Sequence, residues 1–140
     1  LIAQTPDQAV DIETAPFSVR DVYPSDRGIL VHSNHFLDPQ KLQVIEPAID
    51  PRPHSYTRLT RLEAVLEACV PVSIGAVQTA LADHDGYPDS VCRHVHPDDP
   101  PAERCVTVAS AIMDLDQRSL RLSDGQPCSQ PYVEYSIPTY

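Results

Sequence analysis

Lysine is almost absent from this sequence: Lys41 is the only one, against a formal net charge of −10. Nucleic-acid binding requires clustered Lys and Arg, so this composition excludes nucleic acid as a partner. Long hydrophobic runs are also missing. The longest apolar segment, residues 106–113, is interrupted by Thr107 and Ser110 and is far shorter than a bilayer span. We therefore expect no membrane partner either.

Cysteine is scarce as well, with four residues in 140 and no pair of the CxxC type. This number is too small for a disulfide scaffold and predicts free thiols in a reducing compartment, hence an intracellular, cytoplasmic location. The chain begins at Leu1, without an initiator Met or a signal segment. We expect a processed or shortened product, on which any N-terminal targeting segment would not be observable.

Proline, in contrast, is abundant, with 15 residues that predict long ordered loops wrapped on a framework. Short β-prone runs at residues 9–13, 18–23 and 28–32 predict sequential antiparallel strands. A proline-rich loop over residues 34–54 leads to two helices, 55–69 capped by Ser55 and 73–84 starting at Ser73. Strands are predicted again at 105–116, covered on both faces, and at 119–122 and 132–137.

This order of strands, two helices and strands lacks the βαβ alternation of parallel sheets. The sequence therefore predicts an α+β fold with an antiparallel sheet and two adjacent helices on one of its faces. At 15.5 kDa the whole chain, residues 1–140, has the size of one domain or part of one.

Three polar clusters are candidate sites, and two chemistries follow from their residue types alone. They are residues 32–36 (His-Ser-Asn-His-Phe), 83–85 (Asp-His-Asp) and 92–96 (Cys-Arg-His-Val-His). A zinc site could use His32 and His35 with Cys92, His94 and His96, but this spacing matches no common zinc signature, so we expect no bound metal. Cys92 could instead be the nucleophile of a Cys-His-Asp triad, although no glycine-rich oxyanion turn lies near it. The simpler interpretation is that each histidine is a hydrogen-bonded structural residue and that Cys92 is an inert, partly buried thiol.

Taken in order, these motifs resemble the C-terminal half of the acyl-coenzyme A:6-aminopenicillanic acid acyltransferase family. The stretches that carry the resemblance cover nearly the whole chain: 9–13 (AVDIE), 28–37 (GILVHSNHFL), 55–62 (SYTRLTRL), 81–84 (LADH), 90–94 (SVCRH), 107–115 (TVASAIMDL) and 125–128 (GQPC).

The resemblance implies an N-terminal-nucleophile hydrolase with an αββα sandwich, of which this chain is the C-terminal portion. In that family a cysteine exposed by autocatalytic cleavage is the nucleophile, and its own α-amine is the base. Asn34 matches the residue that stabilises the oxyanion, Arg93 stabilises charge near the nucleophile, and His35 and His94 support them. No cysteine of this chain matches the nucleophile, so we expect it on an upstream segment and expect this chain alone to be inactive.

The leading hypothesis is therefore an amide hydrolase or acyltransferase that acts on a small N-acyl amine or acyl thioester through an acyl-enzyme. It needs no metal or resident cofactor, although a coenzyme A thioester is one candidate acyl donor. The expected partners are the nucleophile-bearing segment and a small-molecule substrate. The alternative is a non-catalytic, partner-binding fragment or domain.

Overall fold

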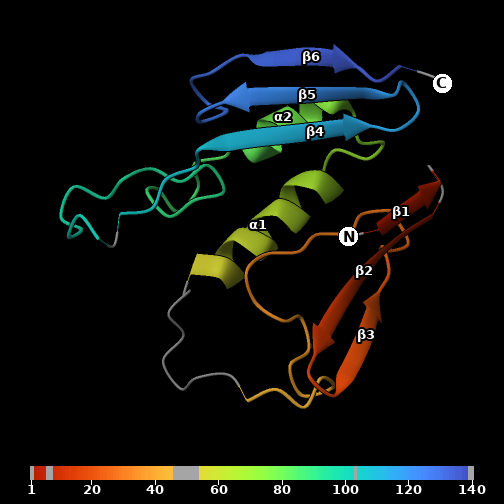
Figure 1. Ribbon diagram of the computed structural model, residues 1–140. Helices are drawn as coiled ribbons and strands as arrows, with labels where there is room; N and C mark the ends of the chain where they lie inside the picture. The colour runs from red at the N-terminus through yellow and green to blue at the C-terminus, as the bar shows by residue number, and fades with distance from the viewer. Residues whose placement is uncertain (1, 6–7, 46–53, 103, 139–140) are drawn as a thin grey trace. The chain divides into compact units, whose positions relative to one another are not determined.

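The computed structural model describes residues 2–5, 8–45, 54–102 and 104–138. The chain forms two compact units, Leu1–Glu63 and Ala64–Tyr140. Figure 1 labels the helices and strands along the chain. The boundary falls within helix α1 (His54–Glu67), which begins in the first unit and ends in the second.

The first unit contains an antiparallel sheet in the order β1 (Ile2–Thr5), β2 (Gln8–Ala15) and β3 (Ser18–Val22). The β2–β3 register pairs Glu13 with Arg20, and the two side chains form an ion pair at 2.9 Å. Polar residues occupy buried positions of β2, because Asp11 and Glu13 are only 7% and 4% exposed. Charged groups at such positions need partners, so the interior of this unit depends on hydrogen bonding.

The predicted third strand, residues 28–32, is wrong: this segment is irregular. A tight turn closes at Gly28, whose N–H donates to the Ser25 carbonyl at 2.8 Å and whose φ is 76°. The segment that follows bonds to side chains instead of a neighbouring strand. The backbone N–H groups of Asn34 and Leu37 donate to Ser55 Oγ and Glu13 Oε1.

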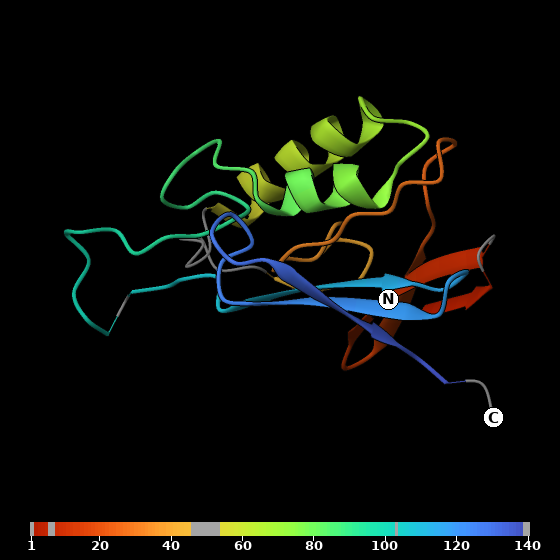
Figure 2. The same cartoon turned by 90° about the horizontal axis from the view of Figure 1, so that it is seen from above.

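The second unit contains helix α2 (Ile74–Leu81) and an antiparallel sheet in the order β4 (Ala109–Asp114), β5 (Ser119–Asp124) and β6 (Tyr132–Ser136). The second helix was predicted to start at Ser73, and Ser73 is its N-cap, because its hydroxyl accepts from Ala76 N–H at 3.1 Å. Ser55 does not cap α1: it lies inside the first turn, fully buried, and bonds to residues 33–35. Figure 2 shows α2 lying along one face of β4 and β5.

The two faces of this second sheet differ sharply in burial. On β4, Ile112 is 7% exposed whereas its neighbour Met113 is 69% exposed. Successive strand residues point to opposite faces, so one face is covered and the other is open. The register places Leu122, Val133 and Tyr135 on the same open face as Met113. The prediction of a strand over 105–116 buried on both faces is therefore wrong in both length and burial.

The α+β class, the antiparallel pairing and both helices are confirmed, with β1 as an additional strand that the sequence analysis did not predict. Instead of one sheet, the described residues form two small ones. Among the described residues, neither helix has the length and apolar character that a bilayer crossing requires.

The pair Ile112 and Met113 provides a test of this burial pattern. We expect Ile112→Ala to lower the free energy of unfolding by about 2–5 kcal/mol, because it empties a buried site. Met113→Ala, on the open face of the same strand, should change it by less than about 0.5 kcal/mol. Urea denaturation of both variants measures the difference; similar costs for the two would contradict the assignment of the faces.

Candidate functional site

A pocket of about 290 Å³ in the first unit brings the 32–36 cluster together with strand β2. Its lining includes Asp11 and Glu13 from β2, and His32, Asn34 and His35 from the irregular segment. Alternation along β2 puts Asp11 and Glu13 on the same face of the strand, which explains why both carboxylates reach this pocket. The pocket thus combines two acidic groups, two imidazoles and an amide.

Glu13 organises this pocket. Its Oε1 lies 3.0 Å from His32 Nε2 and accepts from Leu37 N–H at 2.6 Å, while its Oε2 accepts from Arg20. Burial raises the pKa of Glu13, but the hydrogen bonds from Leu37, His32 and Arg20 together outweigh burial and leave the pKa below its ordinary value of 4.5. Glu13 is therefore a stable carboxylate that orients its neighbours, and it is poorly suited to act as a general acid.

Ser55 organises the other side of the pocket. Its hydroxyl accepts from Asn34 N–H at 2.8 Å, donates to Ser33 Oγ at 3.0 Å and lies 2.7 Å from His35 Nδ1. His35 is 4% exposed and stacks on Tyr56, with ring centroids 3.7 Å apart. These contacts fix the backbone around Asn34.

The Asn34 side chain is oriented by Arg58, whose Nη2 donates to Asn34 Oδ1 at 2.6 Å. Because the carbonyl oxygen is engaged in this way, Nδ2 is the donor branch of the amide. Asn34 lines the pocket, as an oxyanion donor must. The side-chain amide of Asn34 is therefore held by Arg58, and the backbone N–H of the same residue by Ser55.

Arg93 lies in the second unit, in an irregular segment, and Asn34 lies in the first, so their predicted convergence on one pocket stays a prediction. The Arg93 guanidinium pairs with Asp89, four residues earlier in the chain. Its Nε is buried and has no hydrogen-bond partner among the described residues. A buried donor of this kind costs free energy unless another group reaches it.

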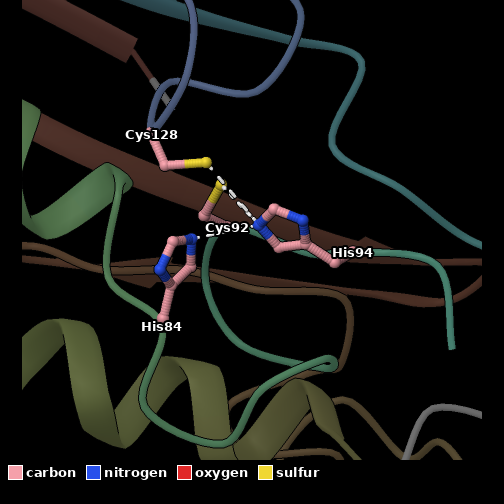
Figure 3. A group of neighbouring side chains, drawn as sticks. All are labelled: His84, Cys92, His94 and Cys128. Atoms are coloured by element: carbon pink, nitrogen blue, oxygen red, sulfur yellow. Dashed lines mark hydrogen bonds between the residues drawn. The ribbon is translucent and has the colours of Figure 1, made fainter.

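A second polar cluster, also in the second unit, unites four side chains: His84, Cys92, His94 and Cys128 (Figure 3). One ligand atom of each lies within 4.8 Å of the others. His94 Nε2 is central, at 3.0 Å from His84 Nε2, 3.8 Å from Cys92 Sγ and 3.6 Å from Cys128 Sγ. Cys92 is fully buried, whereas His84 and Cys128 are exposed. In the described part of the chain this cluster is the group best suited to hold a metal ion.

Backbone hydrogen bonds explain how these distant residues meet. Cys92 N–H donates to the Asp83 carbonyl at 3.1 Å, which holds Cys92 beside the residue preceding His84. Cys128 lies in the turn between β5 and β6, which begins at Gly125 with a φ of 110°, a conformation suited to glycine. The Gly125 N–H donates to Val108 O at 3.0 Å and anchors this turn.

The interpretation of Cys92 as a triad nucleophile is disfavoured by its surroundings. Burial raises the pKa of the Cys92 thiol to about 11, and its side-chain hydrogen bond with Cys128 adds to the increase. The thiolate is the nucleophilic form, so Cys92 is protonated and unreactive at neutral pH.

The zinc ligand set considered from the sequence was His32 and His35 with Cys92, His94 and His96. In the structure His32 and His35 bond to Glu13 and Ser55 in the pocket of the first unit, and Cys92 and His94 join His84 and Cys128. Cys128 was overlooked as a ligand because 33 residues separate it from His94 and no spacing motif spans them. The absence of bound metal stays a prediction, although four side chains with thiol and imidazole donors do come together in the structure.

No known family model matches the chain.

Removing the charge of Glu13 tests the role of this residue. Glu13→Gln should cost about 1–3 kcal/mol of stability at neutral pH, because buried charge-assisted hydrogen bonds are lost. Because the pKa of Glu13 is lower in the folded state, its carboxylate stabilises the fold at pH values above its unfolded pKa of 4.5. This contribution disappears as the pH falls through the folded pKa. The gap between variant and wild type should therefore shrink below 4.5 in pH-dependent denaturation curves.

Glu134→Gln serves as the matched control, because the Glu134 side chain is 51% exposed and pairs with Arg121 at the surface. We expect this variant to lose less than about 1 kcal/mol. A Glu13→Gln protein as stable as wild type at neutral pH would contradict the proposed role of Glu13. So would a difference in unfolding free energy between the two proteins that does not change as the pH is lowered.

Proposed function

We propose that this chain is the C-terminal part of a cysteine N-terminal-nucleophile amide hydrolase or acyltransferase. Its substrate would be a small N-acyl amine or an acyl thioester such as a coenzyme A thioester. The nucleophile-bearing segment is supplied from upstream, and this chain alone is inactive. The observation that carries the proposal is the arrangement of Asn34, which lines a 290 Å³ pocket with its carbonyl oxygen fixed by Arg58.

In the proposed reaction the N-terminal thiol adds to the substrate carbonyl while its own α-amine takes the thiol proton. The carbonyl oxygen becomes an oxyanion, to which Asn34 Nδ2 donates. Collapse expels the amine or thiol, which takes the proton from the α-ammonium group, and leaves an acyl-enzyme. Water or an amine then accepts the acyl group. A buried, protonated Cys92 agrees with a nucleophile on another segment.

Arg93 provides separate support for a missing group. Its buried Nε lacks a hydrogen-bond partner among the described residues, although its other arm pairs with Asp89. Buried donors left without partners are rare and point to a ligand or chain segment that completes them. We assign to Arg93 the stabilisation of charge near the nucleophile, with His35 and His94 as supporting residues.

We further propose that β4, β5 and β6 form an inner layer of an αββα sandwich. Helix α2 lies along one face of this sheet, while the other face exposes Met113, Val133 and Tyr135. Contiguous exposed apolar surface of this kind marks a face that another layer covers. In the proposal, the second sheet of the sandwich is that layer.

Asn34 provides the direct test of the catalytic proposal. In the full-length enzyme, Asn34→Ala should lower kcat about a hundredfold or more and leave the fold intact, because one oxyanion donor is lost. Asn34→Asp should show a similar loss, since it keeps an oxygen for Arg58 but has no N–H donor. Turnover of a chromogenic acyl thioester measures both; near-normal kcat in either variant would end the assignment.

Met113 tests the sandwich. In the 140-residue chain Met113→Ala should be nearly neutral, as argued above. In the full-length protein it should cost about 2–5 kcal/mol, because the proposed second sheet buries this side chain. Denaturation of the full-length pair measures the change; an equally small effect in both contexts would contradict an inner layer.

The alternative, a non-catalytic partner-binding domain, is favoured by the same open apolar face. The two functions differ in what the full-length protein does: the alternative predicts complex formation without turnover of any acyl substrate. For the compartment, we propose the cytoplasm, since the four free thiols agree with reducing conditions.

A further inference from the structure

We propose that His84, Cys92, His94 and Cys128 form a structural, four-ligand zinc site. This inference does not depend on the proposed catalytic function, which needs no metal. It rests on the geometry, the donor types and the local scaffold of the cluster in Figure 3.

Three distances within the cluster, all to His94 Nε2, are close to the edges of a tetrahedron around a zinc ion, and the other ligand atoms lie within 4.8 Å of one another. With Zn–S near 2.3 Å and Zn–N near 2.0–2.1 Å, the edges of such a tetrahedron are about 3.6 Å for S···N and about 3.3 Å for N···N. The observed Sγ···Nε2 distances to His94 are 3.8 Å from Cys92 and 3.6 Å from Cys128. The His84–His94 Nε2 separation is 3.0 Å. In the proposal, side-chain rotations bring all four atoms to coordination distance.

The donor set selects zinc by its chemistry. Two thiolates and two imidazoles in a tetrahedron are a zinc ligand set, whereas Mg²⁺ and Ca²⁺ prefer oxygen donors. On binding, each thiol forms an S–Zn bond and releases its proton to solvent. Two thiolate charges then neutralise the dication, and a neutral complex can sit partly buried at low cost. Four protein ligands leave no position for water, which makes the site structural and not catalytic.

The scaffold places the ligands before any metal arrives. Cys92 and His94 are two residues apart, and Arg93 between them bonds to Thr107 through both its N–H and its carbonyl. The side chains of Cys92 and His94 both point into the cluster (Figure 3). Tyr87 packs beside both imidazoles, with its ring centroid 5.1 Å from that of His94 and 6.2 Å from that of His84. The exposed His84 and Cys128 leave an entry path for the ion.

Gln126 lies beside His94 and is a candidate outer partner. Gln126 Nε2 lies 3.1 Å from His94 Nδ1 and donates to the Arg93 carbonyl. A metal on Nε2 puts the imidazole hydrogen on Nδ1. A turn of the Gln126 amide about its last bond presents Oε1 to accept this hydrogen and gives up the hydrogen bond to the Arg93 carbonyl. Histidine ligands generally have such an acceptor, which fixes the ring. Zinc would thereby tie the end of α2, the 92–94 segment and the β5–β6 turn together.

The test is a cobalt and zinc titration of the 140-residue chain, stripped with a chelator and kept under a non-thiol reductant. Co²⁺ should bind one to one and give the visible and near-ultraviolet bands of tetrahedral thiolate coordination. Equimolar Zn²⁺ should abolish these bands and raise the thermal unfolding midpoint, because it binds the folded state. Absence of the tetrahedral spectrum, with all thiols shown to be reduced, would overturn the proposal.

Variants assign the ligands. Cys128→Ser and His84→Gln alter exposed side chains, so the fold should persist, and each should weaken Zn²⁺ affinity by more than about a hundredfold, beyond the usual loss from an outer partner. The double variant Cys69→Ser/Cys105→Ser removes the two other thiols, both exposed, and should bind like wild type. An unchanged cobalt spectrum in Cys128→Ser, or its loss in the Cys69→Ser/Cys105→Ser control, would overturn the assignment.

Discussion

Satisfaction of buried polar groups is the constraint on which both units of this protein depend. The buried apolar side chains among the described residues are few, namely Val31, Leu42, Ala80, Cys92 and Ile112. Carboxylates, hydroxyls and an imidazole are buried beside them, and each would be costly without partners. Glu13 and Ser55 meet this requirement in the first unit by accepting backbone N–H groups from the irregular segment. The order of that segment, and with it the pocket, follows from these two side chains.

The regular elements could be predicted because their signals are local. The apolar stripe of α1, the Ser73 cap of α2 and the turns around β5 lie within a few residues of the structure that they specify. The failures have non-local causes. Residues 28–32 have a β-prone composition, but their continuation pairs with Glu13 and Ser55, which are distant in sequence. The prediction of Ser55 as a helix cap failed for the same kind of reason, because its hydrogen-bond partners, residues 33–35, are about 20 positions away in the sequence.

The two candidate sites also differ in whether their residues are local or distant in the sequence. The 32–36 motif was predicted to form a site because its polar residues are contiguous; Asn34 lines a pocket, and the role of the motif stays a prediction. The thiol–imidazole cluster was not predicted, because Cys128 joins it only through the fold of the β5–β6 turn. Arg93 is relevant to both the proposed catalytic site and the proposed zinc site. It lies between two proposed zinc ligands, and its buried Nε has no hydrogen-bond partner among the described residues. A zinc ion at Cys92 and His94 would fix the backbone from which this guanidinium projects.

The central claim is that the reactive cysteine lies on another segment of the protein and that this chain only completes the site. Intact-mass analysis of the processed full-length protein, after brief exposure to a slowly hydrolysed acyl thioester, tests it most directly. We predict one acyl adduct on the N-terminal cysteine of the upstream-derived segment and no added mass on residues 1–140. An acyl adduct on Cys69, Cys92, Cys105 or Cys128, with the upstream segment unmodified, would contradict the claim.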